Sequence, residues 1–77
     1  MRPIGSSASA AERIGSFVRE RRRANGLSQT EMALLAGVGR RFVSELESGK
    51  STVRLDKVEA VLAVFGKELE IARERIG

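Results

Sequence analysis

The sequence predicts an all-α domain of four short helices. Three observations support this fold class: apolar residues recur at helical spacing, Ser-x-x-Glu capping boxes precede two of the helical stretches, and glycines follow the stretches. The 77-residue chain is expected to form one domain, which at this size buries only about 60% of its unfolded surface. A second subunit would therefore add to a core that is marginal by itself.

The first helix is expected to begin at a capping box made by Ser9 and Glu12 and to end at Gly26. Its apolar positions recur at the spacing of one helix face: Ile14, Phe17 and Val18. Residues 5–11 are rich in Gly, Ser and Ala. We expect residues 1–8 to form a flexible N-terminal arm.

Two short helices are expected on either side of a tight turn at Gly37. The first begins at a second capping box, Ser28 and Glu31, and ends at Gly37, where the missing Cβ permits a left-handed backbone. The second begins near Gly39, a weaker cap than Ser or Thr, and stops before Gly49. The side chains expected to face the core are Met32, Leu35 and Ala36 in the first of these helices and Val43 and Leu46 in the second.

A fourth helix is expected to follow a short loop, to lack a strong N-terminal cap and to end at Gly66. Its apolar stripe is marked by Leu55, Val58, Leu62 and Phe65. The four helices together define a domain that we expect to span residues 9–66.

The hydrophobic period changes in the tail. Between residues 67 and 73, Leu69 and Ile71 alternate with charged or small residues, which suits a strand. A lone strand leaves its backbone groups unpaired, so residues 67–77 are expected to pair with the same segment of a second copy. The residues expected at this dimer interface are Phe65, Leu69 and Ile71. The alternative is a frayed helical end, because Leu69, Ala72 and Ile76 also lie at helical spacing.

The charge of the chain is unevenly distributed. Residues 1–54 hold ten basic and five acidic side chains, whereas residues 55–77 hold four basic and five acidic ones. Basic side chains gain affinity for a polyanion by releasing the counterions condensed on its phosphates. The asymmetry fits a nucleic acid partner, and the alternative interpretation is a solvated charged surface.

The composition also excludes several classes of site. The chain has no Cys and no His, so it has no disulfide or thiolate metal site and lacks the commonest general base and metal ligand. We expect no catalytic site, metal or cofactor. No apolar run approaches the roughly 18 residues of a membrane span, and the N-terminus lacks a secretory apolar core. The sequence therefore predicts a cytoplasmic protein that is not an enzyme and does not bind a membrane.

The twenty residues from Gln29 to Ser48 have the pattern of a helix-turn-helix, which places its second helix in a DNA groove. Ala33, at the fifth place, must be small because the second helix crosses close by. Gly37, at the ninth, makes the turn, and Val38 fills the angle between the helices. The apolar places are filled by Met32, Ala36, Val38, Val43 and Leu46. The pattern predicts a protein that recognises DNA.

The motif and its setting, from about Ile14 to Gly66, resemble the XRE family, also called the Cro/repressor type, which implies a lambda-repressor-like fold of four or five helices. Residues 37–50 and 52–58, with the strand-like tail, are most similar to HipB-type antitoxins. That resemblance implies a homodimer, joined partly by C-terminal strands, that binds a palindromic operator and a HipA-like kinase toxin. Gly39 departs from the family pattern, in which Ser, Thr or a basic residue is usual.

Base contacts are expected from the outward face of the second motif helix: Arg40, Arg41, Ser44 and Glu45. An arginine fork matches O6 and N7 of guanine, and Arg41 is the best placed for it, whereas Arg40 lies nearer the flank and can instead hold a phosphate. Glu45 either accepts from a cytosine amine or holds Arg41 in place. Phe42 either packs in the core or dimer, which we favour, or contacts a thymine methyl.

Phosphate contacts are expected at two places. The first is the start of the motif, where backbone N–H groups and the helix dipole favour an anion: Ser28, Gln29 and Thr30. The second is the loop after the recognition helix: Lys50, Ser51, Thr52 and Arg54. The family resemblance also implies a structural ion pair between Arg22 and Glu47.

The sequence therefore predicts a DNA-binding regulator, most similar to the antitoxin and autorepressor of a HipBA-like operon. Two alternatives remain: a module whose main role is to bind and neutralise a kinase toxin, and a phage-type repressor without a toxin partner.

Overall fold

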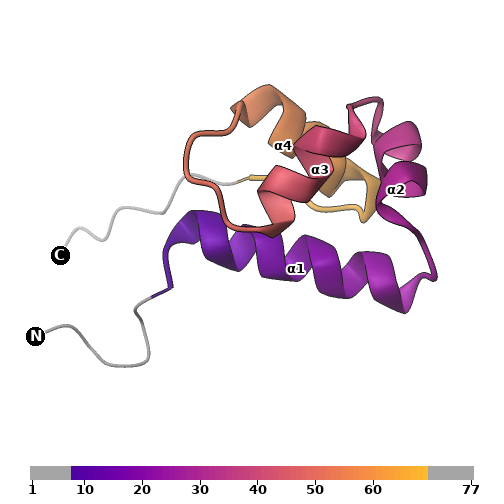
Figure 1. Ribbon diagram of the computed structural model, residues 1–77, viewed down its shortest axis with the longest axis horizontal. Coiled ribbons are helices and arrows are strands. Elements are labelled where there is room, and N and C mark those ends of the chain that lie inside the picture. The colour runs from indigo at the N-terminus through magenta and orange to yellow at the C-terminus, as the bar shows by residue number, and fades with distance from the viewer. Residues whose placement is uncertain (1–7, 70–77) are drawn as a thin grey trace, which may run out of the picture.

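A computed structural model describes residues 8–69 of the chain. It contains four helices, α1 (Ala10–Ala24), α2 (Gln29–Ala36), α3 (Arg40–Glu47) and α4 (Leu55–Val64), and no strand within these residues (Figure 1). The predicted all-α class is confirmed for this part of the chain. Residues 67–69 form neither helix nor strand, and the rest of the tail, with Ile71, lies outside the described residues, as does the predicted arm apart from Ala8.

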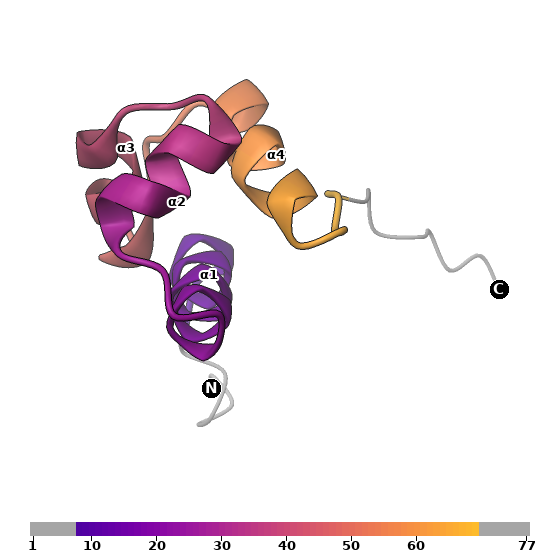
Figure 2. The ribbon, with the colours of Figure 1, turned by 90° about the vertical axis from the view of Figure 1, so that its right-hand side faces the viewer.

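The helices form one cluster in which α1 packs against α3, and α2 packs against both α3 and α4. Figure 2 looks almost along α1 and shows the other three helices gathered on one side of it. None of the helices in residues 8–69 is long and apolar enough to cross a lipid bilayer.

Local sequence explains where the helices begin. Both predicted capping boxes are present: the hydroxyl oxygens of Ser9 and Ser28 accept from the backbone N–H groups of Glu12 and Glu31 at 3.1 and 3.0 Å. The two glutamates in turn accept from the serine N–H groups, each at 2.8 Å. Gly37 ends α2 in the left-handed region at φ 73°, as the motif requires.

The core is built from eight buried residues on all four helices: Val18, Met32, Ala33, Val43, Leu46, Val58, Val61 and Leu62. Two predictions about it are wrong. Leu35 is 60% exposed, because the face that α2 buries runs from Met32 through Ala36 to Ala33, and Leu35 lies beyond Met32. Leu55 is 67% exposed at the first residue of α4, and the buried stripe of that helix includes Val61 instead.

Gly15 sits in the middle of α1, where glycine usually weakens a helix. It is buried, and a Cβ at this position would overlap the backbone carbonyl oxygen of Leu46 in α3. The absence of a side chain therefore sets how closely α1 and α3 approach.

Candidate nucleic-acid interface

The recognition helix of the motif is α3, and it has two distinct faces. Val43 and Leu46 are buried in the core with at most 1% exposure. On the opposite face Arg40 is exposed and the Arg41 side chain is 90% exposed, while Ser44 is half-buried. The Gly39 cap supplies no side-chain hydrogen bond, so the first backbone N–H groups of α3 have no side-chain acceptor. This end of the helix is chemically suited to contact an anionic polymer.

Glu45 lies between two cations on this surface. Its carboxylate is 3.3 Å from Nε of Arg41, one helical turn earlier, and 3.5 Å from Nζ of Lys50, in the loop after α3. Of the two roles predicted for Glu45, holding Arg41 corresponds to the geometry of the free protein. A base or phosphate that binds Arg41 or Lys50 must compete with the carboxylate of Glu45.

The side chains of Arg22, in α1, and Glu47, in α3, are in direct contact. Nε and Nη2 of Arg22 donate to the two carboxylate oxygens of Glu47 at 2.6 and 3.0 Å, and Nη1 donates to the carbonyl of Leu27 at 2.8 Å. The two side chains are only 11% and 4% exposed. Gln29, which was expected to contact phosphate, also donates from Nε2 to Glu47 at 3.2 Å, which places its amide in this network.

The network shifts the pKa values of both Glu47 and Arg22. Burial raises the pKa of Glu47, but hydrogen bonds from Arg22 and Gln29 and the charge of Arg22 outweigh it, so the net pKa is below the ordinary value. The hydrogen bond to Glu47 raises the pKa of Arg22. Both groups therefore stay charged near neutral pH, and the pair has a structural use within the fold.

The residues expected to hold phosphates lie at both ends of the motif. Ser28 uses its hydroxyl oxygen to cap α2, and Thr30 is exposed beside it. The exposed loop residues are Lys50, Ser51, Thr52 and Arg54. Arg54 donates to both oxygens of Asp56 at 3.1 and 2.8 Å, and this hydrogen bonding holds the pKa of Asp56 below its ordinary value. Arg54 must leave Asp56, or share it, to bind a phosphate.

The residues predicted for the dimer interface are already in part packed within their own chain. The rings of Phe65 and Phe17 meet edge to face, with centroids 6.2 Å apart, and Leu69 packs against the core. Phe42, for which core packing was favoured, is half-buried against the core with Nζ of Lys57 5.9 Å from its ring centroid. Ile71 lies outside the described residues.

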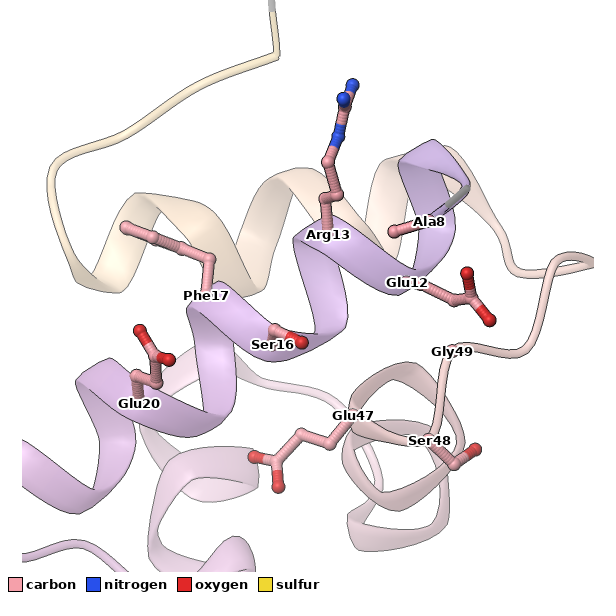
Figure 3. A pocket seen from close by; sticks show the side chains of 9 residues that line it. All are labelled: Ala8, Glu12, Arg13, Ser16, Phe17, Glu20, Glu47, Ser48 and Gly49. Carbon is pink, nitrogen blue, oxygen red and sulfur yellow. The ribbon is translucent and has the colours of Figure 1, made fainter. Parts of the chain in front are cut away.

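Two surface hollows adjoin α1. One lies between α1, α2 and α3, and its lining residues are Arg19, Arg22, Arg23, Gln29, Ser44, Glu47 and Ser48. Sequence reasoning missed Arg19 and Arg23, although their spacing of four on one helix face was visible. The other hollow, shown in Figure 3, lies between α1, as far as Glu20, and the end of α3, and its acidic lining residues are Glu12, Glu20 and Glu47. Within residues 8–69, no three acidic side chains lie in an arrangement that could hold a metal ion.

A family model for the helix-turn-helix, HTH_3, matches residues 18–71, which include the whole motif. The chain belongs to this XRE-type helix-turn-helix family. A curated relative of this helix-turn-helix protein is y4mF of Sinorhizobium fredii, described as an uncharacterized HTH-type transcriptional regulator. The two are 45% identical over 58 residues, covering 75% of this chain and 76% of the relative.

A solved structure is similar to the fold as well as the sequence. A chain of a toxin-antitoxin module from Streptococcus pneumoniae matches with a TM-score of 0.72 and 32% identity, covering 84% of this chain and 71% of that one. The predicted family and the four-helix arrangement of the described residues therefore agree with known proteins.

Proposed function

We propose that this helix-turn-helix transcriptional regulator binds a palindromic operator as a homodimer, with one α3 in the major groove at each half-site. One observation carries the proposal: α3 buries Val43 and Leu46 and leaves Arg40, Arg41 and Ser44 on the opposite face. An α-helix fits the major groove, where each base pair presents a distinct pattern of donors and acceptors. A helix that is fixed on one side and polar on the other suits that groove.

Within this proposal, Arg41 reads a guanine. Its guanidinium is almost fully exposed, and Glu45 holds it by a single long contact of 3.3 Å. A bidentate contact with O6 and N7 of guanine supplies more hydrogen bonds than Glu45 does, so the exchange favours the base. Arg40 and Ser44 contact neighbouring bases or a phosphate, and the loop from Lys50 to Arg54 holds the backbone in register.

We infer the dimer from the small number of base pairs that one α3 can contact. A single α3 covers only a few base pairs, and useful specificity needs two half-sites about one helical turn of DNA apart. We propose that residues 67–77 pair across a twofold axis, with Phe65, Leu69 and Ile71 at the interface. Sedimentation at micromolar concentration should show a dimer, and a chain shortened after Gly66 should be a monomer with weaker operator binding. A full-length chain that stays monomeric would end the dimer proposal.

A second proposed role is that of an antitoxin. The similarity to a chain of a toxin-antitoxin module favours it over a repressor without a partner. The proposed partner is a HipA-like kinase toxin, in keeping with the HipB-like recognition helix and tail. Coexpression with the product of the adjacent gene should yield a complex and relieve toxicity. If the copurified toxin belongs to another class, the kinase part of the proposal is wrong. If no complex forms, the protein is a transcriptional regulator without a toxin partner.

The test of operator recognition is a binding titration with DNA from upstream of the protein's own gene and a scrambled duplex of equal length. We expect a preference for the first duplex. In Arg41→Ala, discrimination should fall by about 1 to 3 kcal/mol for each lost guanine contact. Arg13→Ala removes the same charge from an exposed position on α1 and should keep the preference. Equal affinity of the unmodified protein for both duplexes would refute operator recognition.

A further inference from the structure

The hollow between α1, α2 and α3 is strongly basic. It encloses about 270 Å³, and three arginines of α1 line it together with Gln29, Ser44 of α3 and Ser48, which follows the last residue of α3. Arg19 and Arg23 are one helical turn apart, so their side chains lie on the same face of α1. The wall opposite them is formed by Ser44 and Ser48, also one turn apart.

The charges in this hollow do not cancel. Among residues 8–69, the one acidic residue that lines it is Glu47, which accepts two hydrogen bonds from Arg22 and is therefore already matched. Arg19 lies close enough for its charge to lower the pKa of Glu47, yet within residues 8–69 neither Arg19 nor Arg23 forms an ion pair. Two exposed guanidinium groups thus remain beside the polar wall of α3.

The position of the hollow relative to the base-contacting face is set by helix geometry. Around the axis of α3 the side chains follow in the order Glu47, Arg40, Ser44, Arg41 and Glu45. Glu47 and Ser44 border the hollow, whereas Glu45 contacts Lys50 of the loop. The base-contacting face of α3 therefore has Arg19 and Arg23 on one side and Lys50 on the other.

We propose that Arg19 and Arg23 bind a phosphate of the DNA strand that borders the major groove on the α1 side. The major groove is about 12 Å wide and is bounded by two phosphate strands, so a helix in it has a strand on each side. The Lys50 loop faces one strand, and the hollow faces the other. This inference rests on the proposed DNA-binding function and adds α1 to the interface.

The second hollow is a contrast within the same molecule. It is larger, but Glu12 and Glu20 line it in addition to Glu47, whose carboxylate is paired with Arg22, and in Figure 3 the guanidinium of Arg13 extends away from Glu12 and Glu47. A phosphate there would be repelled by the acidic groups. The sign of the charge, and not the size of the hollow, decides which one binds an anion.

The test compares the unmodified protein with a double variant, Arg19→Gln with Arg23→Gln. Binding of each protein to a random-sequence duplex and to the promoter duplex is titrated at several salt concentrations. The slope of log affinity against log salt should decrease by about 1 to 2 for each subunit, and affinity should fall about tenfold on both duplexes. The preference for the promoter should remain. The matched control, Arg13→Gln with Arg21→Gln, removes two charges from other faces of α1 and should leave the slope near that of the unmodified protein.

The outcomes separate this inference from the proposed function. Unmodified protein that binds neither duplex refutes the function itself. Unmodified protein that prefers the promoter, with equal slopes in the double variant and its control, overturns only the phosphate site. If the double variant keeps the salt slope but no longer binds a protein partner, the hollow binds an acidic protein. That outcome also overturns the phosphate site. Arg19→Lys with Arg23→Lys keeps the charge and should restore the slope, which excludes misfolding as the cause.

Discussion

The guanidinium of Arg22, in α1, and the carboxylate of Glu47, the last residue of α3, form a two-point ion pair with N–O distances of 2.6 and 3.0 Å. The pair joins the helix that borders the motif to the end of the helix that is proposed to enter DNA. Gln29, the first residue of α2, donates to the same carboxylate. Glu47 therefore links three helices, and we expect its loss to lower stability and to disturb the orientation of α3.

Replacing Arg22 with Ala should lower the free energy of unfolding by about 3 kcal/mol, because it leaves the buried carboxylate of Glu47 without its main partner. A domain of this size has about 5 kcal/mol or little more in total, so the variant should be largely destabilised at growth temperature. Thermal and urea unfolding measure the effect. Arg23→Ala, an exposed arginine beside it, should change stability by no more than about 0.5 kcal/mol. Equal stability of the two variants would contradict a structural role for the pair.

The same pair predicts how stability depends on pH. The pKa of Glu47 is lower in the folded protein than its ordinary value of about 4.5, so the folded state favours the ionised form. Its contribution is complete above that ordinary value and is lost as the pH falls through the folded pKa. Urea unfolding from about pH 7 to about pH 3 should show the advantage of the unmodified protein over Glu47→Gln shrinking with acidity. A difference that does not change with pH would show that ionisation of Glu47 contributes nothing.

Gly15→Ala tests the close approach of α1 and α3. In an exposed helix this change stabilises by about 1 kcal/mol, because Ala loses less backbone entropy than Gly. Here a Cβ would overlap the carbonyl oxygen of Leu46, and we expect destabilisation by about 1 to 3 kcal/mol instead. Ser16→Ala, at the exposed neighbouring position, is the control and should be neutral or slightly stabilising. A more stable Gly15→Ala variant would mean that the helices can move apart at no cost.

The loop after α3 should contribute affinity without sequence preference. When Lys50 and Arg54 are both replaced with Ala, binding should weaken by a similar factor on every duplex, and the salt slope should fall by about 2 for each subunit. Arg54 must leave or share Asp56 to bind a phosphate, so its contribution is expected to be the smaller one. Loss of binding on the operator alone would instead assign these residues to base recognition.

Glu45→Gln should change specificity more than affinity for the operator. The carboxylate lies between Arg41 and Lys50 and repels phosphates from both. Without its charge, binding to random-sequence DNA should strengthen severalfold, and the ratio of operator to random affinity should fall. If Glu45 accepts from a cytosine amine instead, operator affinity falls while random binding stays constant. Paired titrations on the two duplexes distinguish these roles.

Much of the fold was predictable because its signals are local. A capping box involves residues three apart, a left-handed glycine ends its own helix, and the helix-turn-helix pattern places its residues within twenty positions. The predicted inward positions failed at Leu35 and Leu55, which are apolar and helical but lie at the edge of a stripe. Periodicity gives the direction of a stripe only to within about one position, and the neighbouring helices decide which edge is covered.

By itself, the sequence determined the helices, their caps, the motif and its family, because each of these depends on residues close along the chain. Tertiary structure alone decided which distant groups share a surface. It brought Gln29 to Glu47, and set Arg19 and Arg23 beside Ser44. The first arrangement depends on how α2 packs against α3, and the second on the close approach of α1 and α3 at Gly15, neither of which follows from the period of any one helix.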